Sequence, residues 1–335
     1  GDIKKLGSVG VKTIVYYMCT TAGAVIIALV LANLCKGFFP PLDKLSSGEY
    51  TAGDPVSFMD TLVNIFPANI IEPMRSASML QVIVIAILFG VGILVAGEKG
   101  LVCAQVVDSF NEVSMKVMDL IIRLSPVGVA CLLAPVVAEN GPKILGALAA
   151  VLLVAYIGYV IHALAVYSFS MAALARISPV TFFREMVPAM MMAFSSASSV
   201  GTLPFTLECA EKLGARKEIA SFVIPLGATI NMDGTAIYQC VATVFLATCA
   251  GMQLTLSQMI LIVVTATLAS IGTAGTPGAG MIMLAMVLEA IGIPVAYIGL
   301  IVAVDRLFDM GRTCLNVTGD IACSLCVTKW ESKKK

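Results

Sequence analysis

The chain has 335 residues, of which 59% are hydrophobic and 13% are charged, and its mean hydropathy is +0.97. Soluble globular domains carry about a quarter charged residues, so this composition indicates an all-α polytopic membrane protein with the lipid bilayer as its surroundings. The formal net charge is zero, which gives no overall basic field that would indicate a nucleic-acid partner.

Two residue types narrow the chemistry further. His162 is the only histidine, which excludes most histidine-based metal sites and Ser-His catalysis, and we expect it to be a hydrogen-bonded helix residue. The ten cysteines lie mostly in apolar runs, so we expect small packing residues and no disulfide framework.

The first expected element is a spanning helix at residues 13–35, which hold no Asp, Glu, Lys or Arg. Residues 36–54 follow as an exposed polar loop with turn residues. Residues 57–97 are mainly apolar but interrupted, which leaves open one kinked span or several short pieces.

The next expected helix, residues 101–138, carries five charged side chains and a predicted kink at Pro126. Charges at that density indicate an amphipathic helix that faces partly into water or protein. After a turn at residues 139–142, residues 144–175 contain no Asp, Glu, Lys or Arg and predict a long, tilted span.

Two later segments share an unusual plan. Residues 178–214 and 254–293 are apolar on both flanks, but residues 195–201 and 270–280 at their middles are rich in Ser, Thr and Gly. Each flank is short for a bilayer crossing, so we expect two half-length helices joined at a polar tip, a re-entrant hairpin. Close packing through small residues is the alternative, and it explains one such segment better than two. Paired interrupted segments are typical of transporter binding sites.

The segment between them, residues 216–250, is interrupted at residues 227–235. It carries one charged residue, Asp233, within its apolar part. Gly227 and Gly234 bracket a place where we expect the helix to unwind and to turn carbonyl groups towards an ion. A hard cation such as Na⁺ prefers oxygen ligands of this kind.

The most polar membrane segment is residues 305–320. Wound at about 100° per residue, five side chains of this segment form one stripe on the helix: Asp305, Asp309, Arg312, Asn316 and Asp320. An ion-pair ladder between packed helices is the structural alternative, but we expect two of the three carboxylates to lack a basic partner on the stripe. Such carboxylates at membrane depth indicate cations supplied from outside.

Basic residues near the expected span ends set the orientation. Lysines and arginines recur at alternate ends, starting with Lys4, Lys5 and Lys12. If these are cytoplasmic, the first hairpin enters from the cytoplasm and the second from outside. The two hairpins therefore form an inverted pair.

Four motifs occur in the order found in one transporter family: Ser198-Ser199 with Gly201-Thr-Leu-Pro204, Asn231-Met-Asp-Gly-Thr235, Gly272-Thr-Ala-Gly275 with Pro277-Gly-Ala-Gly280, and Asp309-Met-Gly-Arg-Thr313 with Asn316-Val-Thr-Gly-Asp320. With these motifs, the whole chain resembles the dicarboxylate/amino acid:cation symporters, the family of the excitatory amino acid transporters and the archaeal aspartate transporter.

The resemblance implies a glutamate-transporter-like fold of eight transmembrane segments, two re-entrant hairpins and an unwound seventh segment. It also implies a homotrimer that works by an elevator motion in a prokaryotic inner or plasma membrane. The chain would begin at the third segment, with the two N-terminal helices absent. The implied domains are a transport-domain helix at 1–38 (segment 3), scaffold helices at 39–141 (segments 4 and 5), and a transport core at 142–335. Within the transport core, the hairpins would lie at 178–214 and 254–293, segment 7 at 216–250 and segment 8 at 294–328.

The resemblance also implies a substrate-binding set: Ser199, Thr235, Thr276, Gly280, Asp309, Arg312, Thr313 and Asn316. In this set Arg312 would hold a side-chain carboxylate of the substrate, Asp309 its α-amino group, and Ser199 with nearby N–H groups its α-carboxylate. The tip at residues 276–280 would close over the substrate as a gate.

Sodium is the implied coupling ion, with three sets of ligands: Asp320 and Asn316 with the carbonyls of Gly227 and Asn231 in the first; the carbonyls of Thr229, Ser270, Ile271 and Thr273 in the second; and Tyr17, Thr20, Thr21, Asn231 and Asp233 in the third.

The resemblance favours Na⁺-coupled symport of acidic amino acids, aspartate or glutamate, because relatives that carry dicarboxylates lack a counterpart of Asp309. Proton- or sodium-coupled C4-dicarboxylate symport is the alternative, and an ion channel or an intramembrane hydrolase are further ones. One position departs from some prokaryotic relatives, in which an arginine stands where this chain has Ala197. Arg306, at the edge of the stripe, is a candidate to compensate.

Overall fold

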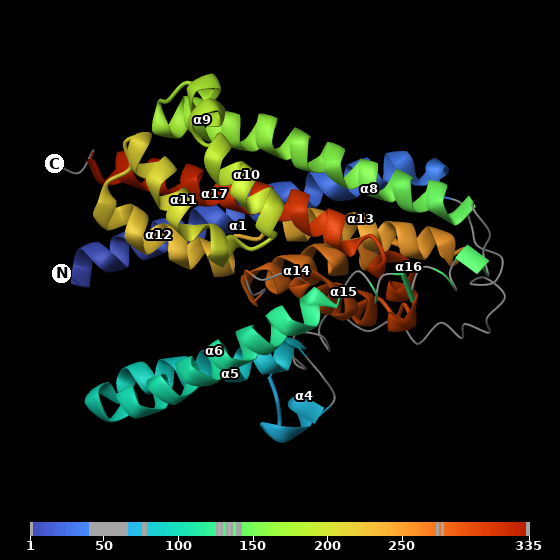
Figure 1. Cartoon of the computed structure of the whole chain (residues 1–335), viewed down its shortest axis with the longest axis horizontal. Helices are drawn as coiled ribbons and strands as arrows, with labels where there is room; N and C mark the ends of the chain where they lie inside the picture. The colour runs from blue at the N-terminus through green and yellow to red at the C-terminus, as the bar shows by residue number, and fades with distance from the viewer. Residues whose placement is uncertain are drawn as a thin grey trace.

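The computed structural model describes residues 3–39, 66–75, 79–124, 127, 130–131, 134, 137–138, 143–272, 275 and 278–332. Every regular element within these ranges is helical, as the composition predicts (Figure 1). Of the loop expected at 36–54, Lys36–Phe38 forms a 3₁₀ turn followed by the buried Phe39, and residues 40–54 lie outside the described residues. The kink at Pro126 and the turn at 139–142 lie outside them as well.

Four long helices lie alongside one another and form the centre of the molecule (Figure 1): α1 (Ile3–Cys35), α8 (Lys143–His162), α13 (Asp233–Cys249) and α17 (Asp305–Ser332). In α13 every residue except Thr248 is buried, because the other three helices and α14 surround it. A helix that is apolar on all sides is expected to be enclosed in this way.

Two stretches are long and apolar enough to cross a bilayer by length and composition, namely Gly7–Phe38 and Ile144–Ala175. They correspond to the two charge-free spans that the sequence predicts. The second stretch does not stay α-helical, since α8 passes into two π-helical segments, Ala163–Tyr167 and Ser170–Ala175.

The chain between these spans forms a separate group of helices: α4 (Ile71–Arg75), α5 (Met79–Val95), the short turn Gly97–Gly100 and α6 (Leu101–Arg123). The interrupted apolar region is therefore several pieces, one of the two forms that the sequence leaves open. α5 and α6 extend away from the central helices (Figure 1), and large apolar side chains such as Leu94 and Phe110 are exposed on them.

The first interrupted segment contains α9 (Pro179–Glu185), α10 (Val187–Ser196) and α11 (Ser199–Lys212). Ala197 turns the chain between α10 and α11 with a φ of 52°, and the Ser198 side chain caps α11 by accepting a hydrogen bond from Gly201 N. Two short helices thus meet at the serine stretch as predicted, while their re-entry into a membrane stays a prediction.

The second interrupted segment contains α14 (Leu256–Gly272) and α15 (Ala279–Ala290), whose connection includes Gly275 and Gly278. Its tip contacts the tip of the first segment, because the Gly275 carbonyl accepts hydrogen bonds from Val200 N at 3.3 Å and Ser198 Oγ at 3.1 Å. Two tips about 75 residues apart in the chain therefore lie together.

The helix break in the seventh segment is shorter than predicted. α12 (Lys217–Ile230) continues through Gly227, α13 begins at Asp233, and only Asn231 and Met232 are non-helical. The Asn231 N–H bonds to the Gly227 carbonyl at 2.8 Å and keeps the last turn of α12 helical. Asp233 starts α13 at the helix N-terminus, where a carboxylate is favourable.

The eighth segment, in contrast, is divided more than predicted. Val295–Ile298 forms a 3₁₀ turn, α16 spans Gly299–Val302, and α17 begins at Asp305. The whole polar stripe therefore belongs to one helix, and all five of its side chains are buried.

The backbone at Arg176 generates a prediction about stability. Arg176 ends the second π-helical segment with a left-handed φ of 62°, where its side chain is exposed. We expect Arg176→Gly to stabilise the protein by about 1 kcal/mol, because glycine adopts this conformation without steric cost. The matched control, Arg184→Gly within α9, should destabilise by about 1 kcal/mol. Thermal unfolding of the purified variants measures both, and a lower melting temperature for Arg176→Gly would contradict the backbone argument.

Candidate functional site

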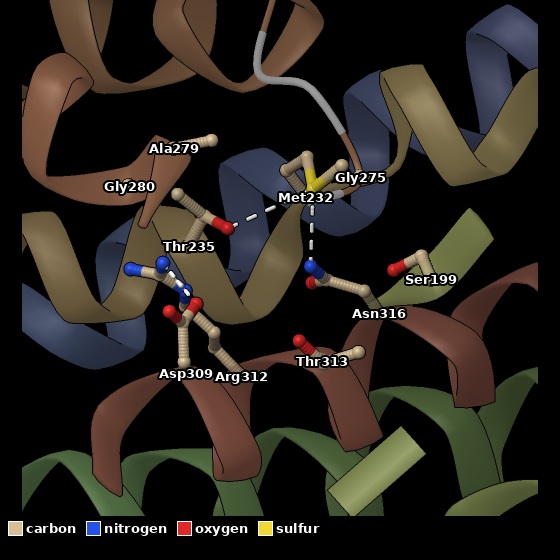
Figure 2. A pocket seen from close by; sticks show the side chains of 10 residues that line it. All are labelled: Ser199, Met232, Thr235, Gly275, Ala279, Gly280, Asp309, Arg312, Thr313 and Asn316. Carbon is tan, nitrogen blue, oxygen red and sulfur yellow. Dashed lines mark hydrogen bonds and ion pairs between the residues drawn. The ribbon is translucent and has the colours of Figure 1, made fainter. Parts of the chain in front are cut away.

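One pocket gathers the predicted substrate residues (Figure 2). It is lined by Ser199, Met232, Thr235, Gly275, Ala279, Gly280, Asp309, Arg312, Thr313 and Asn316. Seven of the eight predicted residues are among them, and the eighth, Thr276, lies outside the described residues. The lining comes from both interrupted segments, the helix break and α17, so distant parts of the chain build a single site.

The strongest interaction in the pocket is the buried ion pair of Arg312 with Asp309, whose side chains lie next to each other in Figure 2. Arg312 Nη1 also lies 3.8 Å from Asp305 Oδ1, and its guanidinium lies 5.1 Å from the centre of the Tyr238 ring. The expectation that two of the three stripe carboxylates lack a basic partner is therefore wrong. One long arginine side chain reaches carboxylates both three and seven residues earlier on the same helix face.

Two glycines allow the surrounding backbone to approach this arginine. A Cβ atom at Gly280 would overlap the Arg312 guanidinium, and one at Gly234 would overlap the Arg312 backbone. The start of α15 therefore packs directly on the guanidinium, and α13 packs directly on α17.

The second interrupted segment closes the pocket through its backbone. The Gly278 N–H donates to Asp309 Oδ2 at 2.8 Å, and the Gly275 carbonyl accepts from Val200 N at the start of α11. The carboxylate of Asp309 and an N–H group at the α11 N-terminus thus both bond to the tip of this segment. These are groups that can also bind an ammonium ion and a carboxylate.

Met232 lines the pocket and was not predicted as a site residue. Its sulfur accepts hydrogen bonds from Asn316 Nδ2 at 3.1 Å and from Thr235 Oγ1 at 3.7 Å, which Figure 2 shows as dashed lines. The signal was its place in the Asn231-Met-Asp-Gly-Thr235 motif, at the break between two helices. Gly275 was likewise missed, because it contributes only backbone, whereas Ala279 was predicted only as part of the gate at residues 276–280.

The first predicted sodium set is brought together. Asn231 Nδ2 donates to Asp320 Oδ1 and to the Asn316 carbonyl, both at 2.9 Å, while a Cβ atom at Gly227 would overlap the Asp320 carboxylate and the Tyr17 hydroxyl. Within the described ranges no Lys, Arg or His forms an ion pair with Asp320, although it is buried. Asn231 Oδ1 is also buried and has no hydrogen-bond partner there. An unneutralised carboxylate beside a free amide oxygen fits a hard cation.

The third predicted set is brought together in part. Thr21 Oγ1 donates to Asp233 Oδ1 at 2.6 Å, and Asp233 is completely buried. Tyr17 and Thr20 instead donate to carbonyl groups, those of Val223 at 3.2 Å and of Tyr17 at 3.1 Å. Neither side chain forms a hydrogen bond to Asp233 in the part of the chain that the structure describes.

Asp233 has two further partners that the sequence did not indicate. Its Oδ2 accepts a hydrogen bond from Tyr167 at 2.8 Å and lies 3.2 Å from His162 Nε2. The expectation that His162 is a hydrogen-bonded helix residue is confirmed. Its position beside a predicted cation ligand was missed, because nothing in the sequence relates these two residues 71 positions apart.

The second predicted sodium set stays a prediction. Thr229 Oγ1 donates to the Leu226 carbonyl at 2.9 Å and Ser270 Oγ to the Thr267 carbonyl at 2.7 Å, so both hydroxyls bond within their own helices. Thr273 and the side chain of Ile271 lie outside the described residues.

Arg306, the candidate to compensate for Ala197, contacts the first tip instead of Asp309. Its Nη2 donates to the carbonyls of Ser195 at 3.4 Å and Ser196 at 3.3 Å, at the C-terminal end of α10. A cation at a helix C-terminus is favourable, so Arg306 holds this tip against α17.

Comparison of the sequence with known proteins assigns the chain to a family. Residues 1–330 match the sequence profile described as the sodium:dicarboxylate symporter family. The chain is 35% identical to the proton/glutamate-aspartate symporter of Escherichia coli (strain K12), with 99% of this chain and 78% of that protein covered. It is 33% identical to the proton/sodium-glutamate symport protein of Bacillus caldotenax, covering 99% and 81%. It is 32% identical to excitatory amino acid transporter 3 of Oryctolagus cuniculus, covering 99% and 74%.

The close approach of α13 to α17 gives a prediction. We expect Gly234→Ala to lower the free energy of unfolding by about 1–3 kcal/mol or more, because the new methyl group meets the Arg312 backbone, which cannot rotate away. Gly146→Ala in α8 is the control, since a Cβ atom there meets nothing within 4 Å. Thermal unfolding in detergent compares the two, and equal stability of both variants would contradict the packing at Gly234.

Proposed function

Because this chain belongs to the sodium:dicarboxylate symporter family, we propose that it is a secondary transporter that couples Na⁺ entry to the uptake of aspartate or glutamate. The observation that carries this proposal is the buried Arg312–Asp309 pair inside a pocket lined by both interrupted segments. A site with both a guanidinium and a carboxylate matches a substrate that carries both charges.

The proposed recognition assigns one pocket group to each charged group of the substrate. The planar guanidinium of Arg312 suits bidentate pairing with a side-chain carboxylate. Asp309 would receive the α-ammonium group, and the N-terminus of α11 at Ser199 and Val200 would receive the α-carboxylate. Thr235, Thr313 and Asn316 add hydroxyl and amide groups around the same pocket.

Substrate entry would require the tip of the second segment to move. The Gly278–Asp309 and Gly275–Val200 hydrogen bonds close the pocket, and the substrate's ammonium and carboxylate would replace them. Residues 276–280 are therefore the proposed gate. Each broken hydrogen bond is matched by one to the substrate, so opening and refilling the pocket costs little net energy.

Sodium would supply the positive charge that the buried acids lack. Asp320 with Asn231, and Asp233 with Thr21, place carboxylate, amide and hydroxyl oxygens together in an interior where a charge costs about 3 kcal/mol on insertion scales. Cations bound at these places would stabilise the helix break that also lines the substrate pocket through Met232 and Thr235. Binding of the ion and of the substrate would in this way be linked.

The wider arrangement is also part of the proposal. Residues 1–38 and 142–335 would move as the transport domain of an elevator, and residues 39–141 would belong to the scaffold of a homotrimer in the cell membrane. The exposed apolar side chains of α5 and α6 suit contacts with lipid or with other subunits. The two hairpins would re-enter the membrane from opposite sides.

The deciding experiment is uptake of radiolabelled aspartate into proteoliposomes with and without an inward Na⁺ gradient. Accumulation that requires Na⁺ and is blocked by excess glutamate supports the proposal. Accumulation driven equally by a proton gradient and competed best by succinate would instead assign C4-dicarboxylate symport. Equilibration without accumulation would indicate a channel.

The proposed role of Arg312 predicts a large loss of aspartate affinity when this side chain is removed. Arg312→Ala should weaken aspartate binding by about 2–5 kcal/mol, because it removes the guanidinium and leaves Asp309 and Asp305 buried without a cation. Binding at saturating Na⁺ measures the effect. Arg184→Ala is the control, since Arg184 is exposed and pairs with its neighbour Glu185. Unchanged aspartate affinity in Arg312→Ala would remove this residue from the site.

The role of Asp309 predicts a change of preference. Asp309→Asn should weaken aspartate binding while improving that of succinate, because the variant loses the acceptor for an ammonium group and no longer repels a second carboxylate. Competition of both compounds against labelled substrate gives the ratio of affinities. A ratio equal to that of the unmodified protein would contradict recognition of the amino group by Asp309.

A further inference from the structure

Three helices converge on the carboxylate of Asp233. Thr21 reaches it from α1, His162 from the end of α8, and Tyr167 from the π-helical segment Ala163–Tyr167. All four side chains are buried, with exposures between 0% and 2%. The predicted sodium ligands include Thr21 and Asp233 but leave His162 and Tyr167 without a role.

The π-helical geometry explains how two residues five positions apart reach the same oxygen. In an α-helix, side chains five residues apart point about 140° away from each other. A π turn is wider and closes its hydrogen bonds between residues five apart, which brings such residues onto one face. The rings of His162 and Tyr167 accordingly meet edge to face with 4.9 Å between centres, and both contact Asp233 Oδ2.

The contacts of His162 fix which nitrogen carries its proton. Nε2 lies 3.2 Å from Asp233 Oδ2, so it is the donor, whereas the buried Nδ1 has no hydrogen-bond partner among the described residues. A proton on Nδ1 would be a buried donor left unpaired, which is costly. With a proton on Nε2, His162 donates to the carboxylate, as Tyr167 and Thr21 do.

Neutral donors orient a carboxylate without cancelling its charge. In the described ranges no Lys or Arg forms an ion pair with Asp233, so its negative charge stays available to a cation. Tyr167 also approaches Asn231, because a Cβ atom at Gly319 would overlap both the Tyr167 hydroxyl and Asn231 Nδ2. The tyrosine hydroxyl thus bonds to Asp233 and lies near Asn231, which is a predicted ligand in both the first and the third sodium set.

We propose that His162 and Tyr167 are positioning residues for a sodium ion bound at Asp233, and that the π-helical segment exists to bring both donors to one carboxylate oxygen. They hold Oδ2 fixed, so the carboxylate keeps one orientation between α1 and α13 whether or not a cation is near. This inference rests on the proposed function, since it assumes that Asp233 is a ligand of the coupling ion. Partners that orient metal ligands typically change metal affinity by about 10- to 100-fold when they are removed.

The test compares Tyr167→Phe, His162→Leu and His162→Gln in the full chain, purified in detergent. Sodium chloride replaces choline chloride at constant ionic strength, and two quantities are followed: thermal stabilisation by Na⁺ alone, and the Na⁺ concentration that gives half-maximal aspartate binding. We expect Tyr167→Phe and His162→Leu to need about tenfold more Na⁺ in both assays. His162→Gln keeps an N–H donor near the place of Nε2 and should need nearly the ordinary concentration.

The control is Tyr16→Phe, which removes another buried hydroxyl of the core, one that forms no hydrogen bond to Asp233 among the described residues. Its Na⁺ requirement should not change, and aspartate affinity at saturating Na⁺ should be unchanged in every variant. An ordinary Na⁺ requirement in Tyr167→Phe and His162→Leu would overturn the inference, as would an equal defect in His162→Gln and His162→Leu, which would indicate packing alone.

The two assays separate this inference from the proposed function. If the unmodified protein is stabilised by Na⁺ but binds no aspartate, the proposed substrate fails while the Na⁺ assay still tests His162 and Tyr167. If Na⁺ does not stabilise the unmodified protein at all, both the sodium site and its positioning residues are overturned.

Discussion

The structure depends on one constraint, the high energetic cost of an unpartnered charge in an interior without water. Arg312 supplies a positive partner for two buried carboxylates, since it contacts Asp309 and lies 3.8 Å from Asp305. Gly280 follows from the same pair, because only glycine lets the start of α15 approach the guanidinium, while Gly234 lets α13 approach the Arg312 backbone. The buried ion pair thus sets how closely α15 packs on α17.

The distribution of charge divides the interior into two kinds of site. Around Arg312 each acid has a cation of the protein's own, so a zwitterionic substrate can exchange partners with it. Around Asp233 and Asp320 the donors are neutral hydroxyl, amide and imidazole groups, and no Lys or Arg of the described chain pairs with either acid. Substrate and cation are thereby expected in different places. The break at Asn231 and Met232 joins them, because one side of it contacts Asp320 and the other lines the pocket.

Much of this could be read from the sequence because it depends on periodicity. The spacing of Asp305, Asp309, Arg312, Asn316 and Asp320 places them on one helix face, and the burial of that face is observed. The partners of the carboxylates were misjudged because side-chain reach is not visible in spacing alone. The break was expected to be longer because a pair of glycines permits unwinding without requiring it. The π-helical segment could not be predicted, since hydropathy is the same for both kinds of helix. For the same reason the contacts of His162 and Tyr167 with Asp233 could not be predicted.

The two interrupted segments have tips held in different ways, and this difference bears on which of them can open. The first tip is fixed by its own chain and by α17, through the Ser198 cap and the Arg306 contacts to the carbonyls of Ser195 and Ser196. The second tip is held through the Gly275 carbonyl, which accepts from Val200 N and Ser198 Oγ, and through the Gly278 N–H, which donates to Asp309. The proposed substrate would also use Asp309 and the N-terminus of α11. Opening the first tip would break its Arg306 contacts without a substrate group to replace them, whereas opening the second exchanges hydrogen bonds to the tip for hydrogen bonds to the substrate. The energetic asymmetry therefore favours the second segment as the moving gate and the first as a fixed wall of the pocket.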